Sequence, residues 1–495
     1  MSQLLSKNPL KAFKEIKNNY ILYLKTAYHT RFEELNDKLN ELWNKEGNLY
    51  KKPYIEALPQ YKNYGQTLEN LPKEIFNTTD EKTAELIKKF IGAGLFAEGK
   101  PYSHQVEMLQ EALNGNNCVI TSGTGSGKTE AFLMPLISQI LKEAVGWKTP
   151  NPIDDTQLNW WNKKEKHERI AHRLHDNETR PAAMRAFILY PMNALVEDQL
   201  TRLREALDSD EVRSLCKSKL NNNRIYFGRY TGNTPVSGQN IDKAKLNLVV
   251  KALQDYQVSS KNLFELENNQ FIKGSIDNDT IAIAKAVKEA KYMFPRMPIG
   301  DNIRKEISSE ILLRWDMQET PPDILITNFS MLSIMLMRKQ EESMLEKTRV
   351  WLSCEDIEDN DRKEYEKTNR IFHLVVDELH LYRGTSGSEL AYLIRLFLHR
   401  LGLSPTIEKK GKKVPNPQLR ILASSASLGN SENDSNTFLR EFFGVESDDI
   451  NNPAFKIISG KDEVEPNRIN KDLKEYKNKF IELSKLNKLH ALSKY

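Results

Sequence analysis

One stretch of the sequence decides the fold class: Cys118-Val119-Ile120-Thr121-Ser122-Gly123-Thr124-Gly125-Ser126-Gly127-Lys128-Thr129. It begins with a short apolar run typical of a buried strand, and an apolar, helix-like stretch follows from Ala131 to Ile140. A glycine-rich turn between a strand and a helix lets backbone N–H groups surround a phosphate at the positive end of the helix. We therefore expect a phosphate-binding loop in which Lys128 reaches the β- and γ-phosphates and the Thr129 hydroxyl binds Mg²⁺. Ser122 takes the place of the usual first glycine, and a small residue is compatible with that turn.

A pair of carboxylates ends a second apolar run. The run Ile371–Val376 leads directly into Asp377-Glu378-Leu379-His380. Such a strand end complements a phosphate loop, because one carboxylate holds Mg²⁺ through water while the other orients and deprotonates the attacking water. We assign the first role to Asp377 and the second, catalytic role to Glu378, which acts with Lys128. An ordinary acidic helix N-terminus is the alternative for the carboxylate pair alone. The phosphate loop on the same chain favours the nucleotide site.

Short apolar runs alternate with helical patterns over residues 89–460. That alternation is typical of βαβ units, so we predict an α/β P-loop domain built on a parallel sheet. A polar stretch, about 144–182, and a long, mostly helical stretch, about 233–320, interrupt the pattern and are expected as two largely helical insertions. The expected strands are Cys118–Thr121, Ala186–Tyr190, Ile225–Phe227, Ile324–Thr327, Ile371–Val376 and Leu419–Ser424.

Helical spacing marks both ends of the chain. Residues 1–88 are predicted to form a helical N-terminal cap, and residues 461–495 a C-terminal linker helix. In the cap, apolar residues recur every three or four positions, at Phe13, Ile16, Tyr20, Tyr23 and Ala27 and again at Phe32, Leu35, Leu39 and Leu42.

Composition excludes several classes of protein. The 495 residues include 72 Lys plus Arg against 68 Asp plus Glu, a net charge of +4 that argues against a histone-like binder but allows a local basic groove. The apolar runs are far shorter than the roughly 20 residues that span a bilayer, and no signal peptide precedes them. Only three cysteines occur, without zinc-ligand spacing. We expect a cytoplasmic protein that does not bind a membrane.

Further motifs lie before, between and after the phosphate loop and the carboxylate pair. They are Pro101–Gln105, Phe187–Gln199, Gly228–Gly232, Ile326–Leu332, Tyr382–Ser388 and Ser425–Asn430. In content and order the whole set resembles the first RecA-like half of a superfamily 2 DExH-box helicase. It is most similar to the large-helicase-related proteins, which include mitomycin-repair DNA helicases and Druantia-type antiphage helicases. The resemblance implies ATP and Mg²⁺ as cofactors and places the Leu419–Ser424 strand between the phosphate-loop strand and the Asp377 strand.

The resemblance also implies roles for residues outside the two core motifs. Gln105 is expected to bond the adenine edge, and Tyr102 to pack near it. His380, Ser425 and Ser427 are expected to couple the phosphate state to the grip on nucleic acid. The implied contacts to the DNA or RNA backbone are Pro191, Asn193, Arg229, Thr231, Gly232, Thr327 and Asn328.

Backbone amides, hydroxyls and side-chain amides bind phosphate oxygens without reading sequence, so these contacts suit a protein that tracks a strand. Arg229 and Arg383 are candidates for the electrostatic part of binding, which weakens with salt. Trp160 and Trp161 lie near three lysines and could stack on bases. Packing of the first insertion against the domain is the favoured alternative for this tryptophan pair.

Helicases of this superfamily place ATP between two RecA-like domains, and the second supplies arginine fingers. This chain contains no Gln-x-x-Gly-Arg-x-Gly-Arg motif after residue 430 and no cysteine cluster. The sequence therefore predicts a motor subunit or fragment whose second RecA-like domain is on another polypeptide. A nucleotide-gated adaptor of a defence or repair complex, which binds nucleic acid without translocation, is the alternative. A signalling ATPase is disfavoured by the ordered motif series. DNA or RNA, and DNA repair or antiviral defence, stay open.

Overall fold

The computed structural model describes residues 9–51, 61–96, 100–123, 125–151, 159–162, 172–173, 180–235, 243–268, 290–299, 308–382, 384–428, 432–449 and 453–460. The chain divides into two compact units, of which the larger spans Lys62–Lys461. The other unit holds the helices α1 (Pro9–Ala27) and α2 (Glu33–Asn44). The predicted linker helix over 461–495 lies outside the described residues.

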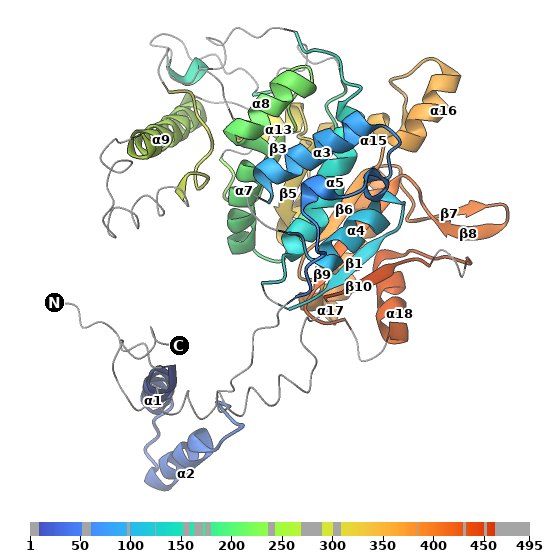
Figure 1. The fold of residues 1–495 in the computed structure, drawn as a ribbon. Coiled ribbons are helices and arrows are strands. Elements are labelled where there is room, and N and C mark those ends of the chain that lie inside the picture. Colours follow the sequence, from blue (N-terminus) through green and yellow to red (C-terminus); the bar gives the residue numbers. More distant parts are fainter. Residues whose placement is uncertain are drawn as a thin grey trace. The chain divides into compact units, whose positions relative to one another are not determined.

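The larger unit is built on an eight-stranded parallel sheet with the order β10-β1-β9-β6-β2-β5-β3-β4 (Figure 1). The prediction of an α/β fold with a parallel sheet is confirmed. The strand β9 pairs with β1 on one side and β6 on the other, so the predicted neighbours of the Leu419–Ser424 strand are confirmed as well. The strands are β1 (Cys118–Thr121), β2 (Ala186–Tyr190), β3 (Phe227–Tyr230), β4 (Glu310–Ile311), β5 (Ile324–Asn328), β6 (Phe372–Val376), β9 (Leu419–Ser425) and β10 (Lys456–Ser459).

Helices cover both faces of this sheet because the side chains of each buried strand alternate between two apolar cores. In β2, for example, Ile188 faces one core and Phe187 the other. The first core lies beneath α3 (Glu81–Gly94), α4 (Ser103–Leu113), α5 (Lys128–Ala144), α7 (Asn193–Asp208) and α8 (Asp210–Lys219). The second lies beneath α13 (Arg314–Glu319), α14 (Phe329–Met337), α15 (Glu342–Ser353), α17 (Thr385–Arg400) and α18 (Glu432–Phe443).

Smaller elements complete the larger unit. The strands β7 (Thr406–Lys409) and β8 (Lys412–Pro415) form a separate antiparallel hairpin. The helix α9 (Lys243–Glu267) lies in the second insertion, and α16 (Asn360–Asn369) precedes β6. Short 3₁₀ turns are η1 (Leu68–Asn70), η2 (Lys73–Phe76), η3 (Trp160–Asn162), η5 (Lys339–Glu341) and η6 (Leu379–Leu381).

The boundary of the N-terminal part differs from the expected residue 88. That position falls inside α3, whose residues Ile87 and Phe90 are buried in the first core. The elements η1, η2 and α3 pack on one another and on the helices that cover the sheet. The boundary between the two compact units therefore lies between Tyr61 and Lys62. In α1 the expected apolar stripe is not the buried face: Ile16 and Tyr23 are 68% and 65% exposed, whereas Ile21 and Leu24 are buried.

The two insertions share a third apolar core. Trp160 and Trp161 are buried there against Val249 and Leu253 of α9, together with Trp315. The Trp161 indole also donates a hydrogen bond to Gln257 Oε1 at 3.2 Å. The tryptophan pair is therefore packed inside the protein, with its partners in the second insertion, and base stacking by these buried rings is excluded in this structure.

In the described part of the chain, none of the helices has the length and apolar character needed to span a membrane.

Candidate nucleotide and nucleic-acid site

The phosphate loop joins the end of β1 to the start of α5. Gly125 and Gly127 have φ angles of +74° and +70°, a region that favours glycine. A Cβ on Gly127 would also lie 2.2 Å from Gln105 Nε2. Ser122 Oγ and Ser126 Oγ are 2.6 Å apart, so the residue in place of the usual glycine closes the loop with a hydrogen bond. Thr124 lies outside the described residues.

Two consecutive side chains at the start of α4 hold this loop. His104 Nε2 lies 2.8 Å from the Ser126 carbonyl oxygen. Gln105 Nε2 donates a hydrogen bond to the Gly127 carbonyl oxygen at 3.0 Å. Gln105 Oε1 accepts from the Tyr102 N–H, and the Tyr102 and His104 rings stack at 5.4 Å. The structure therefore places the predicted adenine-reading residues directly beside the phosphate loop.

Lys128 and Glu378 meet although 250 residues separate them. Lys128 Nζ lies 3.3 and 3.4 Å from the two carboxylate oxygens of Glu378. Glu378 has a φ of +51°, a left-handed conformation that is unfavourable for a residue with a Cβ. Strain of this kind clusters at functional sites. The loop lysine and the predicted catalytic carboxylate thus face each other across the carboxyl edge of the sheet.

Asp377 is buried at the end of β6 and is held by β9. Its carboxylate accepts hydrogen bonds from Ser424 Oγ and from the Glu378 N–H. Burial raises the pKa of Asp377, and the bond from Ser424 opposes that rise. A nearby cation would offset the cost of the buried charge. Asp377 and the half-buried Thr129 offer the oxygen donors that Mg²⁺ prefers, so the donor set fits this ion.

The predicted coupling residues lie between the two halves of this site. The Ala426 N–H donates a hydrogen bond to His380 Nδ1 at 3.3 Å. His380 Nδ1 also lies 3.3 Å from Glu378 Oε2. The Ser425 carbonyl accepts from the Ser122 N–H at 3.3 Å, while Ser425 Oγ donates to the Ser427 carbonyl at 2.8 Å. The end of β9 therefore contacts both the phosphate loop and the segment after Asp377.

The predicted backbone-contacting residues lie in the carboxyl-terminal parts of β3 and β5 or just after β2 and β3, at the same edge of the sheet. Asn193 and Asn328 are joined by a hydrogen bond of 2.5 Å, and Asn328 Oδ1 also caps α14. The Arg229 guanidinium forms an ion pair with Glu197. Pro191 is half-buried at the end of β2, whereas Gly232 is exposed.

Thr231 and Thr327 are buried, and their hydroxyls bond within the protein. Thr327 Oγ1 donates to the Tyr230 carbonyl, while Thr231 Oγ1 accepts from the Asn233 N–H. In this structure their side chains position the strand ends and are not presented to a ligand. Arg383 lies outside the described residues.

The sequence motifs assign no role to two residues of the site, His104 inside the motif Pro101–Gln105 and Ser424 just before the motif Ser425–Asn430. His104 directly precedes Gln105, and Ser424 directly precedes Ser425. Ser424 is a polar residue inside an apolar strand, which is the one sign of a buried hydrogen bond that the sequence offers. What each side chain contacts depends on the strand order, so the roles emerge only from the structure.

Comparisons with known proteins relate the chain to helicases. Residues 102–233 match the model of the DEAD/DEAH box helicase family. The Druantia protein DruE of Escherichia coli (strain UMEA 4076-1) is 29% identical over 473 residues, a match that covers 92% of this chain and 22% of DruE. Crystal structures of the DUF1998 helicase MrfA bound to DNA, and to DNA and AMPPNP, match at 16% identity with TM-scores of 0.37 and 0.39. These two matches cover 81% and 87% of this chain and 29% and 34% of the MrfA chains.

The family match and the DruE match confirm the predicted resemblance to superfamily 2 helicases and to the Druantia type. The chain spans about a fifth of the length of DruE.

Proposed function

We propose that this chain is the ATP-binding, nucleic-acid-binding half of a DExH-box helicase. In this proposal it couples ATP hydrolysis to movement on DNA or RNA once a second RecA-like domain is supplied by another polypeptide or segment. The observation that carries the proposal is the approach of Lys128 Nζ to the Glu378 carboxylate, 3.3 Å apart at the edge where the phosphate loop ends.

The proposal assigns each residue a role in phosphate chemistry. Lys128 moves from the Glu378 carboxylate to the β- and γ-phosphates, which frees Glu378 to accept a proton from the attacking water. Asp377 and Thr129 would hold Mg²⁺, which would neutralise charge on the phosphate oxygens. Gln105, Tyr102 and the amides of residues 122–127 hold and orient the nucleotide.

The strand end of β9 supports a path from the nucleotide to the nucleic acid. Ser425 bonds the phosphate loop, and Ala426 bonds His380 beside Glu378. A change at the γ-phosphate that displaces Glu378 would therefore shift β9 and its neighbours in the sheet. Asn193, the first residue of α7, and Asn328, the last residue of β5, lie at the same edge and are proposed to contact the nucleic-acid backbone together with Arg229 and Gly232.

Hydrolysis by the chain alone is expected to be slow. In related phosphate chemistry an arginine finger supplied by a partner accelerates the reaction by about 10³–10⁵. The proposal assigns that group to the second RecA-like domain.

The first test combines the chain with a candidate second domain and measures ATPase activity with and without nucleic acid. We expect nucleic acid to stimulate the activity. Lys128→Ala should abolish it by weakening ATP binding, and Glu378→Gln should abolish it while ATP still binds. The matched control is Lys142→Ala, which removes a lysine at the other end of α5. The Lys142 ammonium donates a hydrogen bond to the Asn77 carbonyl oxygen and lies away from the nucleotide site. ATP binding without stimulated hydrolysis under any condition would favour the adaptor alternative and contradict the motor.

A further inference from the structure

The β7–β8 hairpin stands apart from the main sheet. Its two strands form a sheet of their own, in a register that sets Lys409 opposite Lys412, and the backbone of Lys413 also exchanges hydrogen bonds with Asp448. Figure 1 shows the hairpin projecting from the α/β unit beside α18. Nothing in the nucleotide site uses it.

Positive charge is concentrated on this hairpin. Residues 406–415 contain four lysines and one glutamate, a net charge of +3, whereas the whole chain of 495 residues carries only +4. The four lysines, 409, 410, 412 and 413, are all exposed. Lys413 forms an ion pair with Glu446 at 2.5 Å. Within the described residues no ion pair is found for Lys409, Lys410 or Lys412.

The turn itself contains one of these lysines. Lys410 and Gly411 have φ angles of +54° and +72°, the pattern of a type I′ turn. Asn, Asp or Gly is favoured at the first of these positions because a side chain there is strained. Lysines on strand edges can be explained as protection against pairing with other strands. That explanation does not extend to Lys410, which lies in the turn.

The hairpin lies far from the nucleotide site. It connects the end of α17 to the start of β9, so it is at the opposite edge of the sheet from Ser425 and the phosphate loop. The 16 residues of α17 span about 24 Å. A ligand of the hairpin is therefore distinct from the strand segment at the helicase motifs.

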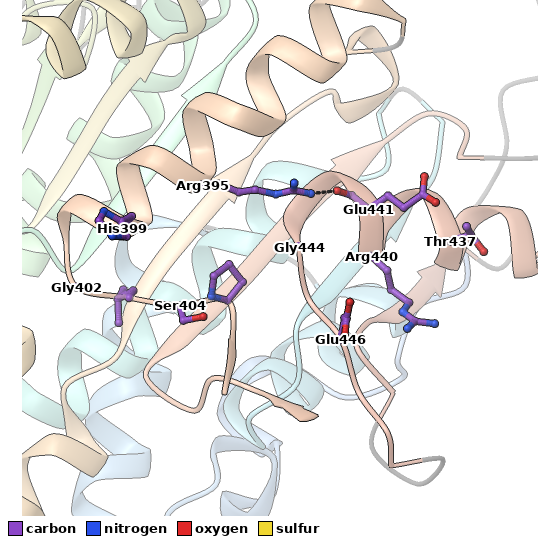
Figure 2. Close-up of a pocket in the computed structure, with 11 residues that line it drawn as sticks. Arg395, His399, Gly402, Ser404, Thr437, Arg440, Glu441, Gly444 and Glu446 are labelled. Atoms are coloured by element: carbon purple, nitrogen blue, oxygen red, sulfur yellow. Dashed lines mark hydrogen bonds between the residues drawn. The ribbon is translucent and has the colours of Figure 1, made fainter. Parts of the chain in front are cut away.

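The charged side chains at the foot of the hairpin are balanced, with Arg395 and Arg440 against Glu441 and Glu446. A cavity of about 940 Å³ there is lined by Ser404 and Pro405, which precede β7. Figure 2 shows Arg395 and His399 of α17 and Arg440 of α18 around it. Two carboxylates also line the cavity, Glu441 and Glu446, and the second is paired with Lys413.

We infer that the β7–β8 hairpin is a second nucleic-acid contact that binds the phosphate backbone of a duplex. The inference rests on the proposed function. A two-stranded ribbon fits the major groove of a duplex, and lysines bind phosphates without reading bases. Single-strand binders add aromatic side chains on which bases stack, and residues 406–415 contain none. The duplex ahead of or behind the gripped strand is the ligand with the matching chemistry.

The test uses the full chain and fluorescence anisotropy with a labelled duplex and a single strand of the same length. The variant K409A/K410A/K412A should bind the duplex at least about tenfold more weakly at low salt. The slope of log affinity against log salt should fall by about three, one for each lost phosphate contact. Binding to the single strand should be unchanged. The charge-preserving variant K409R/K410R/K412R should retain duplex binding.

A matched control comes from α16, which lies at the same edge because it directly precedes β6. Its three basic residues, Arg362, Lys363 and Lys367, are balanced by three acidic ones, Asp361, Glu364 and Glu366. The variant R362A/K363A/K367A makes the same charge change and should leave duplex binding unaltered.

Several outcomes overturn the inference. The hairpin alanine variant could bind the duplex as tightly as the wild-type chain does. The α16 variant could lose as much duplex affinity as the hairpin variant, or the hairpin variant could lose as much affinity for the single strand as for the duplex. A protein that binds duplex normally without the lysines would leave an acidic protein partner or edge protection as their role. If the wild-type chain binds neither duplex nor single strand, the proposed function fails first, and the two failures are therefore distinguishable.

Discussion

His104 and Gln105 bond two consecutive carbonyls of the phosphate loop, at Ser126 and Gly127. A carbonyl oxygen repels a phosphate, so holding both carbonyls toward α4 leaves the loop amides to face the ligand. Because a carbonyl only accepts, Nε2 of His104 must carry the proton. Burial lowers the pKa of His104, which keeps the ring neutral near pH 7. We expect His104 to be a positioning residue of the nucleotide site.

Two substitutions separate the hydrogen bond from the packing of this ring. His104→Phe keeps an aromatic ring beside Tyr102 but leaves the buried Ser126 carbonyl oxygen without its hydrogen-bond donor. An unsatisfied buried acceptor destabilises this loop conformation by about 1–3 kcal/mol. We expect the Kd for a fluorescent ATP analogue to rise about tenfold, and His104→Gln to recover part of the affinity. His399→Phe, at an exposed position on α17, is the control. Unchanged affinity in His104→Phe would rule out the positioning role.

Lys128, Asp377 and Glu378 could be predicted from the sequence because each lies in a motif whose chemistry fixes its residue types. The roles of His104 and Ser424 could not be predicted, because each role depends on a hydrogen-bond partner that only the fold brings close. Thr231 and Thr327 show the opposite case. Their residue type suits a phosphate contact, but the strand geometry turns both hydroxyls to partners inside the protein.

At the scale of elements, long apolar runs were sufficient to locate strands. The four or five apolar residues in β2 and β6 predict their own burial, and the motif at the end of β9 predicts its place between β1 and β6. The strand β10 has only Ile457 and Ile458 as apolar residues and forms because it pairs with β1, more than 300 residues away. The start of β3 was expected at Ile225 and lies at Phe227. Pairing across long sequence distances leaves no local signal for such elements.

A buried ion network anchors the first insertion to the sheet. Asp323, directly before β5, accepts hydrogen bonds from Arg180 at 2.6 Å and Arg185 at 2.9 Å, and from the Tyr226 N–H at 2.8 Å. Burial alone would raise the pKa of Asp323, but Arg180, the neighbouring Arg173 and Arg185 hold it well below its usual range. The guanidinium of Arg180 also lies 3.4 Å from the ring centre of Trp147.

Removal of one partner from such a network leaves buried charges uncompensated. We expect Asp323→Asn to lower the free energy of unfolding of the larger unit by about 3–5 kcal/mol, as measured by urea denaturation. Asp361→Asn, on the exposed face of α16, makes the same chemical change and should alter stability by less than about 0.5 kcal/mol. A loss at Asp323 no larger than at Asp361 would show that the network contributes no net stability.

At the scale of the molecule, most of the chain is one enlarged α/β unit whose charge is nearly balanced. Balance overall does not exclude binding to a polyanion, because phosphates at the motif edge are bound by amides and hydroxyls and the unbalanced charge is local to one hairpin. Among its described residues, the same unit buries two histidines away from the nucleotide site. His172 Nε2 lies 2.6 Å from the Ser308 carbonyl, and His373 lies within β6. Burial lowers the pKa of His172 to about 4 and that of His373 to about 3.

These two histidines make stability depend on pH in a defined window. Both are neutral in the folded state, while the unfolded chain binds protons near pH 6.5, so acidification from about pH 6.5 toward pH 4 favours unfolding. At about pH 5 each histidine lowers the free energy of unfolding by about 2 kcal/mol relative to pH 7.5. His172→Gln removes the titrating group and retains a hydrogen-bond donor. It should therefore reduce the difference in the free energy of unfolding between these two pH values by about 2 kcal/mol, as measured by urea denaturation, whereas His399→Gln, at an exposed position, should not. An unchanged difference in the His172 variant would mean that its ring is protonated in the folded protein, and the burial of a neutral histidine would be contradicted.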